Sequence, residues 1–250
     1  MRLVALGSRL VNRLLPRLLS RSDYGLVWNW VGRSLTAARW SVAGTADLAE
    51  IERTGLSSAD TIARETGIGP TDVVLEIGCG IGRVGRHLAP RCGRWIGADV
   101  SLRMLSHARR AMAGISNVSF QPLTGYNLTG IDDGSVDVVY CTAVFMHLDE
   151  WDRYSYVLDS GRVLRPGGRL YIDNFNLLGE EGWQLFLGNS RYDPAARPPN
   201  ISKASTPEEL RTYVERAGFT DVRVLAGPLW LTVVARKPAA APISGAHRSR

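Results

Sequence analysis

Two carboxylates flank a glycine-rich segment in the first half of the chain. Glu76 lies near the end of an apolar run, and Gly78, Gly80 and Gly82 follow it at every second position. Glycines at this spacing let the backbone approach a ligand closely, and the N-terminus of a helix that begins there offers free N–H groups. Asp99 ends the next apolar run, where a carboxylate can accept hydrogen bonds from both hydroxyls of a ribose. The pattern predicts a nucleotide-type binding site.

The glycines alone leave the ligand open. Gly80, Gly82 and Gly85 also satisfy the G-x-G-x-x-G fingerprint of dinucleotide sites. Glu76 favours a different ligand, because a carboxylate facing the loop repels a pyrophosphate and attracts an ammonium group. We therefore expect a ligand that carries an ammonium group, and an NAD(P)-dependent oxidoreductase of Rossmann type is the alternative.

Short apolar runs alternate with amphipathic stretches from about residue 72, as in a parallel sheet wrapped by helices. We expect a Rossmann-like α/β fold with a seven-stranded, mostly parallel sheet and helices on both faces. Gly227-Pro228 predicts that the last two strands form an antiparallel hairpin. The strands are expected at 71–78, 93–100, 117–122, 135–144, 169–175, 221–227 and 229–237, and the helices at 82–92, 101–114, 151–164 and 205–219.

Three parts of the chain differ in composition. Residues 1–56 are expected to form a basic, tryptophan-containing helical extension or cap, residues 57–238 the ligand-binding domain, and residues 239–250 a disordered tail. Within residues 1–22 an arginine recurs every four positions, which stacks the charges along one face of a helix. Such a helix either lies on anionic lipid or packs on the body as an accessory helix.

Charge and cysteine content exclude several classes of protein. The net charge of +6 is concentrated at the two ends, and residues 40–235 carry 19 basic and 23 acidic side chains, so no nucleic-acid-binding body is expected. Three cysteines without a C-x-x-C pair build neither a disulfide framework nor a structural zinc site, and we expect no bound metal. We find no apolar window long enough to span a membrane. A cytoplasmic protein is expected, with contact to the inner membrane surface if residues 1–22 bind lipid.

Four segments in order resemble the class I S-adenosylmethionine-dependent methyltransferases, over roughly residues 68–237. The loop E-x-G-x-G-x-G is similar to the first motif of that family, and GADVS with a downstream ML is similar to its ribose and adenine segment. SVDVVYCTAVFMHL resembles the fourth-strand motif, and RVLRPGGRLYI the signature before strand five. The resemblance implies S-adenosylmethionine as co-substrate and a methyl transfer as the reaction.

The resemblance also implies roles for individual residues. Glu76 and the Gly78 backbone would hold the methionine ammonium, Asp99 the ribose, and Thr142 the methionine portion, with Gly80 and Gly82 completing the loop. Val100 and Met104 would sandwich the adenine. Many members place an acid after strand three to meet the adenine amino group, whereas this chain has Leu123 and Thr124, so that contact falls to a hydroxyl or to backbone.

His147, just past strand four, is the best-placed titratable group for chemistry. It is expected to act as a general base for a hydroxyl acceptor or as an orienting donor, and the alternative is a histidine that only bonds to backbone. Asp173, at the end of strand five, can orient it. These residues favour methylation of an oxygen on a hydroxylated metabolite, glycan or lipid-linked precursor. A non-catalytic binding module would hold the donor without consuming it, and a nucleic-acid methyltransferase would need a basic face that residues 40–235 do not supply.

Two regions are expected to cover the acceptor. Residues 24–56 contain three tryptophans and few charges, and they are expected to form helices over the open edge of the sheet. Residues 176–205 form a long connection of the kind that makes lids and binding loops. Its most promising contact residues are Trp183, Phe186, Arg191 and Tyr192.

Overall fold

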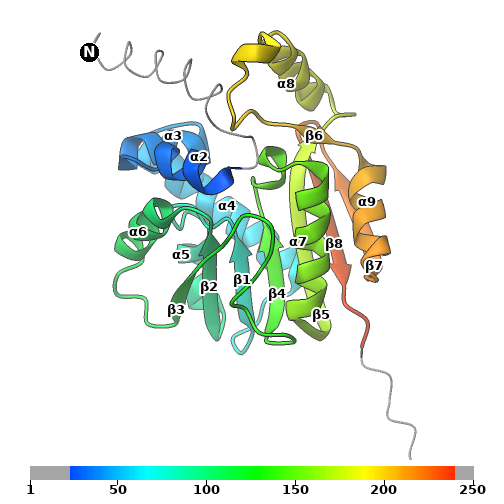
Figure 1. The fold of residues 1–250 in the computed structure, drawn as a ribbon. Helices are drawn as coiled ribbons and strands as arrows, with labels where there is room; N and C mark the ends of the chain where they lie inside the picture. Colours follow the sequence, from blue (N-terminus) through cyan, green and yellow to red (C-terminus); the bar gives the residue numbers. More distant parts are fainter. Residues whose placement is uncertain (1–22, 240–250) are drawn as a thin grey trace, which may run out of the picture.

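The protein, seen in a computed structural model, is an open sheet with helices on both faces and further helices at one end of the strands (Figure 1). The structure describes residues 23–239, so the predicted helix within residues 1–22 and nearly all of the predicted tail lie outside it. The helices are α2 (Tyr24–Val31), α3 (Leu35–Ala43), α4 (Leu48–Thr66), α5 (Gly85–Leu88), η2 (Ala89–Arg91), α6 (Leu102–Ala111), η3 (Phe145–His147), α7 (Glu150–Val163), α8 (Glu180–Ser190), η4 (Pro194–Ala196) and α9 (Pro207–Arg216). The strands are β1 (Val73–Ile77), β2 (Arg94–Asp99), β3 (Val118–Pro122), β4 (Val136–Cys141), β5 (Leu164–Asn176), β6 (Ala204–Ser205), β7 (Thr220–Ala226) and β8 (Trp230–Arg236).

The strands form one sheet in the order β3-β2-β1-β4-β5-β8-β7, and the short β6 pairs with β5. Strands β1 to β6 pair in parallel, whereas β8 runs antiparallel to both β5 and β7. The predicted Rossmann-like fold with a terminal hairpin is confirmed. The additional strand, β6, is two residues long, and so short a strand leaves no periodic signal in a sequence.

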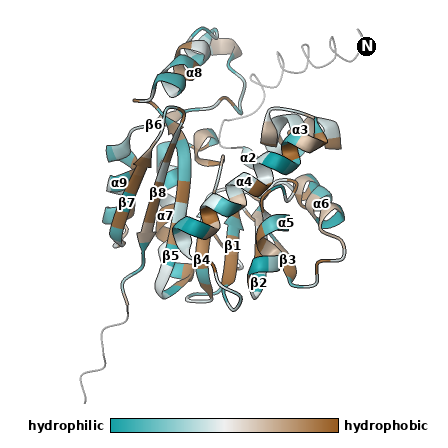
Figure 2. Cartoon of the chain, turned by 180° about the vertical axis from the view of Figure 1, so that it is seen from behind, coloured by the Kyte–Doolittle hydropathy of each residue, from teal (hydrophilic) through white to brown (hydrophobic). Residues whose placement is uncertain are grey.

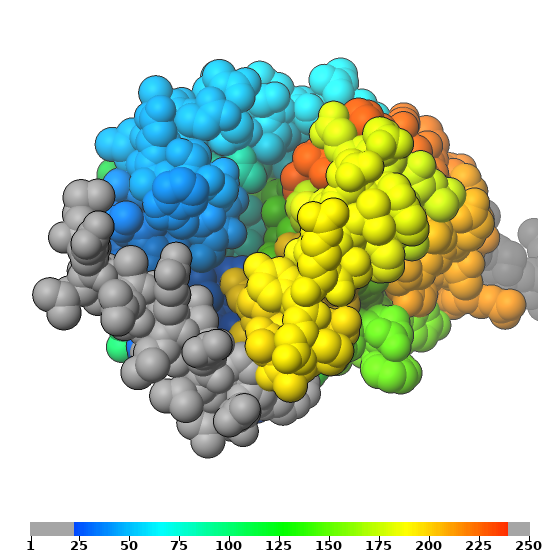
Figure 3. Space-filling model, turned by 90° about the horizontal axis from the view of Figure 1, so that it is seen from above, coloured from blue at the N-terminus to red at the C-terminus, as the bar shows by residue number. Residues whose placement is uncertain are grey.

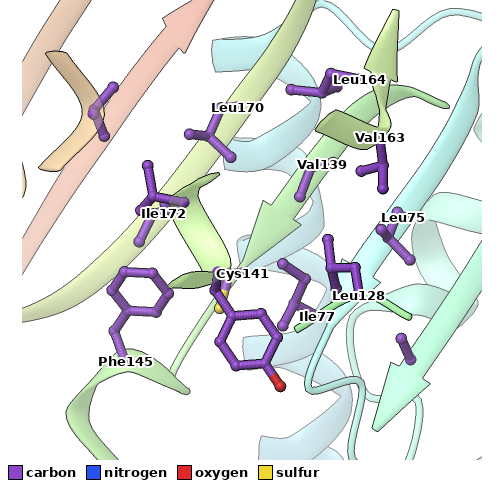
Figure 4. Close-up of a cluster of buried hydrophobic side chains, with 14 of the residues drawn as sticks. Leu75, Ile77, Leu128, Val139, Cys141, Phe145, Val163, Leu164, Leu170 and Ile172 are labelled. Atoms are coloured by element: carbon purple, nitrogen blue, oxygen red, sulfur yellow. The ribbon is translucent and has the colours of Figure 1, made fainter. Parts of the chain in front are cut away.

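Each face of the sheet carries its own hydrophobic core, because successive side chains of a strand point to opposite faces. Leu75 and Ile77 of β1 pack on one face with residues of β4, β5 and the neighbouring helices, as Figure 4 shows. Val74 packs on the other face beside Trp95 and Tyr140. Seen from behind, the central strands are largely apolar in colour, as expected for strands buried on both faces (Figure 2).

The helix predicted at 82–92 begins three residues later than expected, because α5 and the adjoining 3₁₀ helix η2 cover residues 85–91. Gly82 has φ +78°, outside the helical region, and its N–H donates to the carbonyl of Cys79 at 2.9 Å. The chain therefore turns once more before α5 begins at Gly85. The sequence places a helix here from its apolar spacing alone, and the glycine conformation delays the start.

The N-terminal helices are joined to the sheet by specific hydrogen bonds. The Tyr24 hydroxyl donates to Asp152 Oδ2 at 2.6 Å and accepts from the Asp149 N–H at 3.1 Å, which fixes α2 on the start of α7. Asn29 Oδ1, also in α2, accepts a hydrogen bond from the Ser101 hydroxyl at 3.1 Å. This bond fixes α2 on the start of α6. The expected boundary at residues 56 and 57 falls inside α4, so the extension continues into the domain through one helix. Within residues 23–239, no helix is both long and apolar enough to cross a membrane.

Gly85 gives a test of how tightly this fold is packed. A Cβ at Gly85 would lie 2.1 Å from Cζ2 of Trp95, a ring that is fully buried. We expect Gly85→Ala to lower the free energy of unfolding by about 1–3 kcal/mol, because the ring has no room to move. Gly188→Ala in α8 is the matched control: it meets no atom within 4 Å and should raise stability by about 0.4–1 kcal/mol. Urea unfolding measures both, and equal effects of the two changes would contradict the expectation.

Candidate functional site

A cavity of about 820 Å³, counted with its open mouth, lies beyond the C-terminal ends of β1, β2 and β4. From above, a hollow separates the blue N-terminal helices from the yellow segment that contains α8 (Figure 3). Most of the predicted residues line it, namely Glu76, Gly78, Gly80, Asp99, Val100, Met104, Thr142 and His147.

Gly78 and Gly80 line the cavity. At both positions a residue with a side chain would be strained. Gly78 has φ +72°, and a Cβ there would lie 2.3 Å from Cγ2 of Val144. Gly80 has φ +54°, and a Cβ there would lie 3.1 Å from Cγ1 of Val42 in α3. Backbone therefore faces the cavity at both positions, and a ligand can approach it closely.

Gly82 packs the loop against a neighbouring helix. A Cβ at Gly82 would lie 2.9 Å from the sulfur of Met112, so this glycine packs the loop against the end of α6. It does not line the cavity. The loop returns to the cavity at Arg83 and Val84, and the predicted contact of Gly82 with the ligand stays a prediction.

Glu76 is held by a chain of hydrogen bonds from two neighbouring strands. Its side chain is 2% exposed, and the Tyr140 hydroxyl donates a short hydrogen bond to its Oε2. Trp95 Nε1 donates to the same hydroxyl at 3.0 Å. Because an indole N–H can only donate, the Tyr140 proton must point to Glu76. Burial raises the pKa of Glu76 to about 8, while the Tyr140 hydrogen bond and the charge of Arg83 oppose the shift.

Sequence reasoning missed Trp95, Tyr140 and Arg83. Tyr140 pairs with Glu76 across β1 and β4, so it lies on the same face of the sheet. An alternating pattern shows which face each residue occupies, but only the strand register shows which residues are neighbours. Arg83 directly follows the glycine loop and lines the cavity.

Asp99 lies at the cavity with its carboxylate fixed by backbone. Oδ2 accepts from the Gly80 N–H and Oδ1 from the Ser101 N–H, both at 2.8 Å. Burial raises the pKa of Asp99 to about 6, and these amides oppose the shift. Its predicted role toward a ribose stays a prediction. Val100 and Met104 follow at the same end of the cavity, as expected for an apolar ring site.

The predicted pair between Asp173 and His147 is wrong. Asp173 Oδ2 accepts from the Thr142 hydroxyl at 2.5 Å, and Oδ1 accepts from the Ala143 N–H at 2.7 Å. Ala143 has φ +58°, a strained conformation for a residue with a side chain, and the carboxylate stabilises it. Asp173 therefore fixes the end of β4, including the cavity-lining Thr142, and does not orient the histidine.

His147 is oriented by a backbone carbonyl. Its Nδ1 lies 3.0 Å from the carbonyl oxygen of Asn200, in the segment after α8. The edge of its ring also contacts Trp28 of α2, with ring centroids 4.8 Å apart. Burial lowers the pKa of His147 to about 4. The imidazole is consequently neutral at physiological pH.

Thr124 and the residues predicted as lid contacts do not line the cavity. The Thr124 hydroxyl donates to Asn127 Oδ1 at 3.0 Å, outside the cavity, and the flanking Leu123 and Gly125 line the wall in its place. The four residues predicted as lid contacts do not line the cavity. Trp183 and Phe186 stack on each other with centroids 5.1 Å apart and stay more than 40% exposed. The segment reaches the site through the Asn200 backbone instead.

The N-terminal helices form part of the cavity wall. Tyr24 and Trp28 of α2 and Ser41 and Val42 of α3 line the cavity. Buried carboxylates, exposed loop backbone and an apolar end together match a nucleoside that carries a cationic amino acid portion. The donor set thus fits S-adenosylmethionine, and the buried Glu76 carboxylate disfavours a pyrophosphate beside it.

Comparison with known proteins gives the same answer. Residues 74–168 match a family described as a methyltransferase domain. The chain carries a class I S-adenosylmethionine-dependent methyltransferase domain. S-adenosylmethionine is the methyl donor of this class, so the resemblance found in the motifs is confirmed and the dinucleotide alternative is not supported.

Relatives of the methyltransferase domain are diverse. It is 26% identical over 208 residues to chondramide synthase cmdD of Chondromyces crocatus, covering 82% of this chain and 5% of the synthase. It is 28% identical over 204 residues to the human thiol S-methyltransferase TMT1A, covering 79% of this chain and 80% of that protein. A solved S-adenosylmethionine-dependent methyltransferase of Thermotoga maritima, a possible histamine N-methyltransferase, superposes with TM-score 0.61 at 19% identity, covering 84% and 99% of the two chains. The chain spans between 5% and 39% of the length of the first four curated relatives that it matches.

The methyltransferase domain should bind its donor in a pH-dependent way. With a pKa of about 8, Glu76 is protonated in the free protein at pH 7, and the ammonium of the donor favours the ionised form. Binding at pH 7 should therefore release a proton, and the affinity should fall by about tenfold for each pH unit below 8. Calorimetry in buffers of different ionisation enthalpy measures both quantities.

Glu76→Gln should abolish both the proton release and the pH dependence. Glu208→Gln is the matched control, because Glu208 is exposed in α9, away from the cavity. Proton release that persists in Glu76→Gln would show that another group titrates.

Proposed function

We propose that this protein is a methyltransferase that acts on a hydroxyl oxygen of a small-molecule acceptor, with His147 as general base. When bound, S-adenosylmethionine supplies a methyl group activated by a sulfonium. The acceptor oxygen has to lose its proton during the transfer. The observation that carries the proposal is the hydrogen bond between His147 Nδ1 and the Asn200 carbonyl.

This hydrogen bond fixes the tautomer of His147. A carbonyl oxygen only accepts hydrogen bonds, so the proton of the neutral ring must lie on Nδ1. Nε2 then keeps its lone pair, and His147 lines the cavity. The ring holds this orientation through its edge contact with Trp28. A neutral imidazole with a free Nε2 is the form that can accept a proton from a hydroxyl.

The low pKa of His147 restricts the class of hydroxyl group that the protein can methylate. A base with a pKa of about 4 is always unprotonated near neutral pH, but it is too weak to ionise an aliphatic alcohol before transfer. It acts best on a hydroxyl that is already acidic, since proton transfer is most efficient when the two pKa values are matched. A phenolic or enolic hydroxyl, with a pKa of about 10 in the phenolic case, fits better.

The names of the relatives support methyl transfer as the reaction. They differ in the acceptor atom, so the choice of oxygen rests on the residues of this site. They include a ubiquinone biosynthesis O-methyltransferase, a thiol S-methyltransferase and an arsenite methyltransferase. The segment 23–56 and the segment 177–203 supply Trp28 and the Asn200 carbonyl, which surround His147. We therefore propose that these two segments select the acceptor.

A panel of acceptors tests the proposed function. The protein is incubated with methyl-labelled S-adenosylmethionine and separate phenols, enols, aliphatic alcohols, thiols and amines, and products are identified by mass spectrometry. We expect label on a phenolic or enolic oxygen. Label on sulfur or nitrogen alone would overturn the oxygen assignment. Binding of the donor without transfer to any class, or tighter binding of NAD, would overturn the methyltransferase proposal.

His147 variants test the base role on whichever acceptor reacts. His147→Gln should lower kcat by about 10²- to 10⁴-fold, because the proton acceptor is lost, while donor affinity stays the same. For the unsubstituted protein, kcat at saturating donor should stay level from pH 9 to pH 6, since a pKa of about 4 keeps His147 unprotonated there. Full turnover by His147→Gln at these pH values would remove the base role.

A further inference from the structure

The seven tryptophans of the chain are divided between the interior and the surface. All of them lie within residues 23–239, where Trp95 belongs to the core and Trp28 lines the cavity. The remaining five are exposed by between 38% and 73%: Trp30, Trp40, Trp151, Trp183 and Trp230. A tryptophan ring left in water forgoes the apolar burial to which it is suited, so the set indicates a surface that a partner covers.

All five exposed tryptophans lie at the end of the sheet where the cavity opens. Trp30 and Trp40 belong to α2 and α3, and other residues of these helices line the cavity. Trp151 is the second residue of α7, which follows β4, and Trp183 lies in α8, which follows β5. Trp230 begins β8, and because β8 runs antiparallel to β5 it lies beside the end of β5. The blue N-terminal helices and the yellow segment with α8 border the hollow in Figure 3.

Other large apolar side chains are exposed beside these tryptophans. Leu26 is 58% exposed in α2, one turn before Trp30 and therefore on the same face of the helix. Phe186 stacks on Trp183 in α8. We define the rim as the exposed apolar side chains of α2, α3 and α8: Leu26, Trp30, Leu35, Trp40, Trp183 and Phe186.

Positive charge accompanies the rim. The Arg33 guanidinium lies over the ring of Trp30, 4.6 Å from its centroid. Neither α2 nor α3 contains an acidic residue, and residues 1–46 contain seven arginines against one acidic residue, Asp23. Asp23 directly precedes α2, so the arginine-rich segment 1–22 joins the chain at the rim. Arginine together with tryptophan is the composition of segments that lie on anionic bilayers.

We propose that the rim and the arginines of residues 1–46 dock on the surface of an anionic lipid bilayer, with the mouth of the cavity facing the lipid. Tryptophan favours the boundary between lipid and water, because its ring is apolar and its N–H can donate a hydrogen bond. Arginine adds attraction to the lipid phosphates. A second copy of this chain suits the surface less well, since it would bring seven further arginines against the same face.

Co-sedimentation of the full chain with vesicles tests the docking without relying on catalysis. One set of vesicles contains phosphatidylcholine alone, and the other also contains phosphatidylglycerol, which is anionic. We expect the protein to bind the anionic vesicles about 100-fold more tightly, and added salt to weaken this binding, since salt screens the arginines. Absence of binding to both kinds of vesicle, or equal binding to both, would overturn the proposal.

Leu26→Ser tests the apolar part of the surface. It should weaken binding to anionic vesicles by about tenfold, because a leucine side chain no longer enters the lipid. Leu158→Ser is the matched control, since Leu158 is 46% exposed in the second half of α7, outside the rim. Equal weakening by the two changes would contradict the assignment of the rim.

Trp183→Ser tests the other side of the hollow and should weaken binding by a similar factor. Thermal unfolding checks that every variant is folded. If Leu26→Ser does not fold, Trp40→Ser replaces it, because Trp40 is 57% exposed in α3.

A double change, Arg13→Gln with Arg17→Gln, tests the charge. It should weaken binding to anionic vesicles by about 10- to 30-fold and leave any binding to phosphatidylcholine unchanged. An unchanged affinity for anionic vesicles would remove the arginines of residues 1–22 from the proposal. Sedimentation velocity without lipid identifies the rival partner: a dimer that Leu26→Ser dissociates, in a protein that binds no vesicles, would replace the bilayer by a second copy.

Docking in this orientation would let an acceptor dissolved in the lipid enter the cavity directly. This consequence rests on the proposed function, and a phenol with a long alkyl chain, dissolved in each kind of vesicle, tests it. Label from S-adenosylmethionine should reach the phenol faster in anionic vesicles, and equal rates would overturn delivery from lipid. Binding to anionic vesicles without transfer to any phenol would instead overturn the proposed function and leave the docking surface supported.

Discussion

A carboxylate buried at the end of a strand must find hydrogen-bond donors, and this requirement organises the whole site. Asp99 has two backbone amides, and Asp173 has one amide and one hydroxyl. Glu76 accepts a hydrogen bond from the Tyr140 hydroxyl. Burial raises the pKa values of Asp99 and Asp173 to about 6 and that of Glu76 to about 8, while these hydrogen bonds oppose the shift. The least compensated carboxylate is the one that most needs a cationic ligand.

The other two carboxylates shape the backbone around the ligand. Asp99 ties the glycine loop to the end of β2 through Gly80. Asp173 ties the end of β4 to β5 through Ala143, where the backbone is strained. Both strain and close approach are stabilised by buried charge rather than by apolar packing. Asp99 and Asp173 therefore both fix backbone at the cavity end of the strands.

The sequence predicts the parts of this site that depend on local order. Glu76, Gly78, Gly80, Asp99 and Thr142 lie at the cavity because each is placed by the end of its own strand. Their neighbours depend on strand register, which short apolar runs do not encode. Tyr140 and Trp95 look like ordinary core residues in the sequence, yet their hydrogen bonds hold Glu76.

Several residues that the sequence singles out have partners within the protein. Asp173 and His147 both follow strand ends, but the Ala143 amide takes the carboxylate that the histidine was expected to use. Trp183 and Phe186 satisfy each other by stacking, outside the cavity. In each case a polar or aromatic side chain contacts another group of the protein. The sequence does not show which groups are close in space, so it does not identify these contacts.

The contact between His147 and Asn200 is made by a main-chain oxygen. Every amino acid presents that same carbonyl, so residue 200 can be replaced by others without changing which ring nitrogen carries the proton. What has to be preserved is the path of the chain past the imidazole. The segment after α8 is accordingly free to vary its side chains, and with them the shape of the mouth, while the chemistry of the histidine remains constant.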